Sequence, residues 1–73
     1  MYLAFVEFAD GSHFIIHQGS AATCLVGIEA AVEGKGMDTL ELDGTEMFHI
    51  IPTERVSVVE QKDGTYKIEV KGR

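Results

Sequence analysis

The sequence predicts an α+β domain in which one helix packs on an antiparallel sheet of five or six strands. The first observation is an Asp-Gly dipeptide that occurs three times between β-rich runs, at Asp10-Gly11, Asp43-Gly44 and Asp63-Gly64. Glycine supplies the positive φ angles that tight hairpin turns require. The second observation is a stretch of small apolar residues at helical spacing after the first hairpin. The predicted order is ββ-α-ββ-ββ in a single domain over residues 1–73, and a curled, barrel-like sheet plugged by the helix is the alternative.

The first predicted hairpin joins Tyr2–Ala9 to Ser12–Gln18 and is apolar on both faces. Its first strand carries large apolar residues at neighbouring positions, and Phe14, Ile15 and Ile16 follow without alternation in the second. A strand that is apolar on both faces is usually buried on both. We therefore expect this hairpin at the centre of a sheet or against a second subunit.

Residues 20–33 predict one helix of about four turns. Ser20 is a suitable N-cap, and Gly34 or Gly36 can end the helix in a left-handed conformation. Gly27 costs about 1 kcal/mol relative to alanine in a helix interior, and small residues permit a close approach of neighbouring backbone. The stripe that we expect to lie on the sheet consists of Ala21, Leu25, Ile28 and Val32.

Two further hairpins are predicted after the helix. The second joins Asp38–Leu42 to Thr45–Ile51, and the third joins Arg55–Glu60 to Thr65–Lys71. Pro52 has no N–H to donate, so it marks the corner between them. In the last strand, apolar and charged residues alternate, which predicts one dry face formed by Tyr66, Ile68 and Val70.

The charge balance and cysteine content restrict the environment and the partners. Twelve acidic and six basic residues give a net charge of −6, which argues against a nucleic-acid partner held by phosphate neutralisation. Eight acids against one base give −7 up to Ile51, and four acids against five bases give +1 from Pro52 onwards. A single cysteine rules out an intrachain disulfide and favours a reducing compartment. No segment reaches the roughly 20 apolar residues of a membrane helix, so we expect a cytoplasmic protein that does not enter a membrane.

Histidine and cysteine residues are the first candidates for chemistry. His13 and His17 are four residues apart, which on a helix would suit a metal such as zinc. On a strand they share a face but stand about 13 Å apart, so joint ligation would require His49 to lie between them from a neighbouring strand. Cys24 has apolar neighbours, which favours a buried thiol over a nucleophile. We predict no metal, no cofactor and no catalytic residue, and therefore no enzymatic activity.

Acidic side chains are the candidates for binding a partner. The predicted partner-binding residues are Glu29, Glu33, Asp38, Glu41, Asp43 and Glu46. The ligand spacing of an EF-hand calcium loop is absent, so a solvated acidic face is the simplest interpretation and a docking surface for a basic protein is the second.

The favoured function is that of a non-enzymatic interaction or regulatory protein that acts as a homo-oligomer. The chain has more large apolar residues than one sheet face and one helix face readily cover, and a domain of this size has little stability to spare. The predicted oligomer interface contains Phe5, Phe8, Phe14, Ile16 and Val26. The alternatives are an acidic inhibitor that mimics nucleic-acid charge and a binder of a small ligand at a subunit interface.

Overall fold

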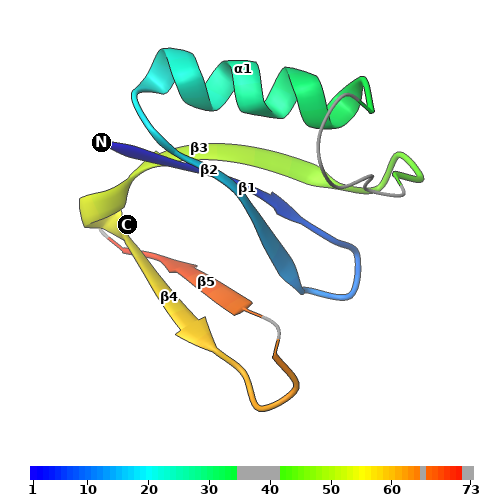
Figure 1. The fold of residues 1–73 in the computed structure, drawn as a ribbon. Coiled ribbons are helices and arrows are strands. Elements are labelled where there is room, and N and C mark those ends of the chain that lie inside the picture. The colour runs from blue at the N-terminus through cyan, green and yellow to red at the C-terminus, as the bar shows by residue number, and fades with distance from the viewer. Residues whose placement is uncertain (35–41, 65, 72–73) are drawn as a thin grey trace.

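The computed structural model describes residues 1–34, 42–64 and 66–71 of the chain (Figure 1). Within these residues the α+β prediction is confirmed, with one α-helix and a five-stranded antiparallel sheet. The elements are, in chain order, β1 (Tyr2–Glu7), β2 (His13–Gly19), α1 (Ala21–Val32), β3 (Met47–Pro52), the 3-10 helix η1 (Thr53–Arg55), β4 (Val56–Glu60) and β5 (Tyr66–Val70).

The sheet has the strand order β3-β1-β2-β5-β4 and is open rather than barrel-like. β1 pairs with β2 on one side and with β3 on the other, both antiparallel. All four residues from Leu3 to Val6 are buried. The expectation that the first hairpin lies inside the sheet is therefore confirmed, but only its first strand is buried on both faces, since Phe14 of β2 is exposed.

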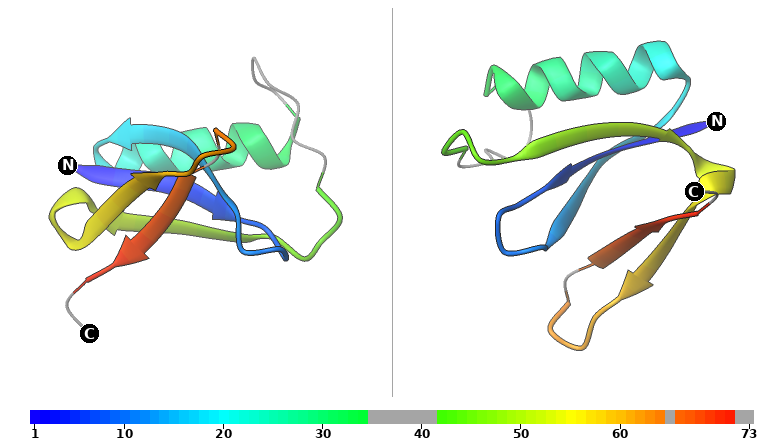
Figure 2. Two further views of the ribbon diagram at one scale, coloured as in Figure 1. Left: turned by 90° about the horizontal axis from the view of Figure 1, so that it is seen from below. Right: turned by 180° about the vertical axis from the view of Figure 1, so that it is seen from behind.

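The two faces of β1 are covered by different elements. α1 lies across one side of β1, β2 and β3, and the β4–β5 hairpin lies on the other side (Figures 1 and 2). On the helix side, Ala4, Val6 and Cys24 have no exposed surface. On the hairpin side, the core consists of Leu3, Phe5 and Ile68, packed against partly buried Ile15, Ile51 and Val56.

A bulge in β2 changes which side its residues face. Ala4 stands opposite His17, but the next residue, Phe5, stands opposite Ile15, so Ile16 is the extra residue. Both Ile16 and His17 then lie against α1, where they are the nearest neighbours of Gly27. The prediction that His13 and His17 share a face is wrong, because the bulge interrupts the alternation between them.

Two of the three Asp-Gly turns connect paired strands, as predicted. Gly11 and Gly64 have φ angles of 88° and 86°, in the left-handed region that favours glycine. Asp43-Gly44 differs. Residues 38–41 of the predicted strand lie outside the described residues, Leu42 is not in a strand, and β3 begins only at Met47. Thr45 instead caps a local loop by donating its N–H and hydroxyl to Asp43.

The ends of α1 agree with the prediction, but its buried face does not. The Ser20 side chain accepts the N–H of Thr23 over 3.1 Å, and Gly34 follows the helix with a φ of 74°. The predicted stripe is wrong at Ala21, Leu25 and Val32, which are exposed, and holds at Ile28, which is half-buried. The buried and half-buried residues of α1 are Cys24, Gly27, Ile28, Ala30 and Ala31. Small side chains at Cys24 and Gly27 allow the helix to sit close to β2.

The β4–β5 hairpin is only partly covered. Pro52 ends β3 and leads through η1 into β4, as the predicted corner requires. Ile68 is buried, but its neighbours on the same face, Tyr66 and Val70, are each 41% exposed. The face that was predicted to be buried is therefore buried only at Ile68.

Candidate interaction surface

The outer side of α1 carries the most exposed large apolar side chains of any described secondary-structure element. Leu25, Val26 and Val32 are 51%, 64% and 55% exposed. We call these three residues, together with Ala22 and Glu29, the outer α1 surface. A helix at the surface of a globular protein normally turns polar residues outward, so an apolar outer side is typical of a surface that binds another protein.

The composition of α1 explains why this surface is apolar. Apart from Thr23 and Glu29, every residue of the helix is apolar or glycine. Such a helix has no polar face to turn toward water, so burying one side leaves other apolar residues exposed. The side on the sheet is the one with the smallest residues, because these permit the closest packing.

The predicted interface residues have different exposures. Phe5 is 2% exposed and packs inside its own chain, so it is not available to a second folded copy. Phe8 and Ile16 are half-buried. Phe14 and Val26 are exposed, and Phe14 is paired with Val6, which places it on the side of the sheet that α1 covers.

The described members of the predicted acidic set lie on two segments, the end of α1 and the loop before β3. Glu29 and Glu33 lie at the C-terminal end of α1 and are exposed. Glu46 instead accepts the backbone N–H groups of Asp43 and Gly44 over 2.8 and 3.0 Å. The hydrogen bond from the Thr45 side chain lowers the pKa of Asp43 below its usual range. Asp38 and Glu41 lie outside the described residues.

Two of the three histidines meet at a carboxylate that the sequence analysis did not single out. Glu7 Oε1 lies 3.3 Å from His49 Nε2 and 4.0 Å from His13 Nε2. Both imidazole rings contact Phe5, His49 by stacking at 4.9 Å between ring centroids and His13 edge-on at 5.6 Å. His17 lies on the opposite side of the sheet, where its Nε2 is 3.1 Å from the Thr23 hydroxyl.

This histidine cluster is not arranged as a metal site. The backbone N–H of Ile68 donates to His13 Nδ1 over 3.3 Å, so the neutral ring carries its hydrogen on Nε2, the atom that faces Glu7. A nitrogen that carries hydrogen has no lone pair to offer a metal. Within the described residues, no group of three or more His, Cys, Asp and Glu side chains could hold a metal ion.

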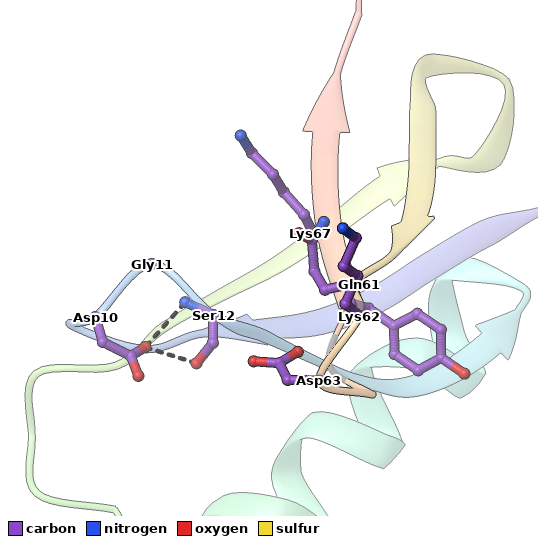
Figure 3. A pocket seen from close by; sticks show the side chains of 8 residues that line it. Asp10, Gly11, Ser12, Gln61, Lys62, Asp63 and Lys67 are labelled. Carbon is purple, nitrogen blue, oxygen red and sulfur yellow. Dashed lines mark hydrogen bonds between the residues drawn. The ribbon is translucent and has the colours of Figure 1, made fainter.

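A cleft of about 860 Å³ lies between the Asp10-Gly11 turn and the Asp63-Gly64 turn. Figure 3 shows Asp10 and Ser12 on one side of it and Lys62 and Lys67 on the other. The Ser12 hydroxyl donates to Asp10 over 2.6 Å, which lowers the pKa of that carboxyl group. The cleft is wide, open and of mixed charge, so its lining selects no particular class of ligand.

Cys24 is fully buried, as predicted. Its Sγ contacts the backbone carbonyl oxygens of Tyr2 at 3.5 Å and His17 at 4.0 Å, with weak hydrogen-bond geometry. A thiol without exposed surface is out of reach of a molecule in solution, which does not suit a nucleophile.

No helix in the described parts of the chain has the length and apolar content that crossing a membrane requires.

Comparison with known proteins identifies no relative of this chain. No family model matches the chain, and neither the curated proteins nor the solved structures contain a significant match.

Proposed function

We propose that this chain is a non-enzymatic interaction protein that forms a homodimer through the outer α1 surface. The observation that carries the proposal is the exposure of Leu25, Val26 and Val32 on a helix that has almost no polar residues. A second copy of the chain provides the same surface, and two-fold symmetry is the usual arrangement of such self-complementary contacts.

The charges on α1 favour an antiparallel arrangement of the two helices. Val26 stands midway between the N-cap Ser20 and the C-cap Glu33. If the two-fold axis passes near Val26, Glu29 and Glu33 of one copy approach the first turn of α1 in the other. The helix dipole makes that first turn electropositive and the last turn electronegative. Glu29 and Glu33 lie at the electronegative end of their own helix, which is unfavourable for an acidic residue. In the dimer they would face the electropositive end of the partner's helix, which is favourable.

The acidic end of α1 also bears on the choice of further partners. Glu29 and Glu33 border the apolar residues, so a basic protein surface could contact both copies beside the dimer interface. Electrostatic complementarity of this kind directs association and selects partners more than it adds affinity.

Sedimentation equilibrium at micromolar concentration tests the dimer. The wild type is expected to sediment as a dimer. Val26→Glu should weaken dimerisation by at least about ten-fold, because it buries a charge at the centre of the interface. Val59→Glu is the matched control, since Val59 is an exposed valine of β4 on the other side of the sheet from α1, and this variant should remain dimeric.

A second variant tests the orientation of the helices. Glu29→Lys places a cation near the partner's helix N-terminus and should raise the dimer dissociation constant about two- to five-fold at low salt, with less effect at high salt. A wild type that is folded and strictly monomeric at micromolar concentration would overturn the proposal. Equal disruption by Val59→Glu and Val26→Glu would show that the interface is elsewhere.

A further inference from the structure

The β4–β5 hairpin is joined to the rest of the sheet by a short contact. Among the described residues, β2 and β5 are paired at one position, His13 opposite Tyr66, whereas β1 pairs with β2 and β3 along most of its length. Beyond that position the two strands diverge (Figure 1). Further links are the packing of Ile68 and Val56 in the cluster with Leu3 and Phe5, and the chain connection through η1. The position of the hairpin therefore depends strongly on the contact between His13 and β5.

His13 holds β5 through an atom that can take up a proton. The backbone N–H of Ile68 donates to Nδ1 of His13, so that nitrogen presents a lone pair to β5. The side chain is 9% exposed, and its ring packs against Phe5. Protonation of the neutral ring adds a hydrogen to Nδ1. Two N–H groups would then face each other across 3.3 Å, and the hydrogen bond could not persist.

The charged and titratable groups around His13 come from β1, β3 and the hairpin. They are Glu7 on β1, His49 on β3, Tyr66 on β5 and Glu60, which is opposite Tyr66 on β4. The Glu7 carboxylate lies beside both imidazoles, and its Oε1 is closer to His49 Nε2, at 3.3 Å, than to His13 Nε2, at 4.0 Å. His49 Nε2 is buried without a well-aligned hydrogen bond, so the contact with Glu7 matters more to His49 than to His13.

We propose that His13 is a proton-sensitive latch between the three-stranded part of the sheet and the β4–β5 hairpin. With a neutral ring, Nδ1 holds the Ile68 amide and the hairpin covers Leu3 and Phe5. When a fall in pH places a proton on Nδ1, the ring releases that amide. The hairpin then loosens and opens the apolar cluster beneath it. This device is independent of dimerisation, because α1 covers the opposite side of the sheet.

Amide hydrogen exchange measured by NMR tests the latch in the wild-type protein. The protection factor of the Ile68 amide, corrected for the pH dependence of intrinsic exchange, should fall about ten-fold between pH 7.5 and pH 5, in step with the titration of the His13 ring. The amide of Val6, in the centre of the sheet, should keep its protection over the same range. A constant Ile68 protection factor while the His13 ring titrates would overturn the proposal.

Three variants assign the effect to one histidine. His13→Asn offers a side-chain oxygen near the place of Nδ1 that accepts a hydrogen bond but does not titrate, so Ile68 protection should become independent of pH. His17→Asn and His49→Asn leave the latch in place, and the pH dependence should persist in both. If it disappears in His49→Asn and persists in His13→Asn, the sensitive group is His49 and the assignment to His13 is wrong.

Discussion

Gly27 of α1 lies against His17 of β2, so closely that a Cβ added to Gly27 would stand 3.2 Å from the Cβ of His17 and 3.4 Å from Cγ2 of Ile16. The Cβ of His17 is attached to the backbone and cannot rotate away. A side chain at this position would therefore need α1 or β2 to shift by a few tenths of an ångström, which favours glycine although it is an unfavourable residue in a helix interior.

Gly27→Ala should consequently destabilise the protein by about 1 kcal/mol in urea unfolding. Overpacking costs about 1–3 kcal/mol, which exceeds the gain of about 1 kcal/mol in helix propensity. Ala22→Gly, on the exposed side of the helix, is the control and should lose about 1 kcal/mol through propensity alone. A more stable Gly27→Ala variant would show that α1 can move away from β2 at little cost.

The turn between β4 and β5 depends on the positive φ of Gly64. Gly64→Val should lower the free energy of unfolding by more than about 1 kcal/mol, because a β-branched residue is strained in this conformation. A Cβ at Gly64 would meet no other atom within 4 Å, so the loss measures backbone conformation and not packing. Asparagine tolerates this region better, and Gly64→Asn should lose clearly less. Equal stability of the valine variant and the wild type would contradict the turn geometry.

The Cys24 thiol should react slowly with a thiol reagent in the native protein. It has no exposed surface, so labelling requires an opening of the contact between α1 and β1. The rate should rise steeply in urea as the chain unfolds. Rapid labelling without denaturant would mean that α1 opens readily, and would also reopen the question of a reactive cysteine.

Asp10 should contribute to the loss of stability in acid. The hydrogen bonds from the Ser12 side chain and backbone lower the pKa of Asp10 in the folded protein. A lowered pKa favours the folded state above the unfolded pKa of about 3.9, and this contribution disappears as the pH falls through the folded value.

Asp10→Asn therefore should reduce the difference in unfolding free energy between pH 7 and pH 3. The asparagine oxygen still accepts from Ser12, so the variant removes the charge and keeps an acceptor in the turn. Glu60→Gln, on β4, controls for the loss of one negative charge. An undiminished pH dependence in Asp10→Asn would assign the acid sensitivity to other carboxyl groups.

The parts of the fold that follow from local chemistry could be predicted from the sequence. Gly11 and Gly64 mark their turns because no other residue adopts a positive φ as readily, and Ser20 marks the start of α1 because its side chain caps a free N–H. The helix face on the sheet could not be predicted from periodicity, because α1 is apolar on every side. The small size of Cys24 and Gly27 was the one available signal.

The histidine cluster depends on relationships that no local pattern contains. His49 meets Glu7 only because β3 pairs with β1 in a particular register, in which Phe5 stands opposite His49. His13 and His17 are separated by a bulge that the run Phe14-Ile15-Ile16 does not reveal. In the sequence Glu7 has no distinguishing feature, because no residue near it in the chain indicates that two imidazole rings lie beside it in the fold.

The inner position of β1 has a consequence for the newly made chain on the ribosome. β1 ends at Glu7, and the strand that completes its pairing begins at Met47. Until β3 is translated, a nascent chain with only β1, β2 and α1 has an unpaired edge along β1, and Leu3 and Phe5 remain uncovered until β5 also arrives. Unpaired apolar edges promote association with other chains, and non-local pairing is slow to form. A ribosome that stalls before β3 or β5 is translated would therefore hold a fragment with exposed apolar surface. Chaperones that bind exposed apolar segments would recognise this fragment.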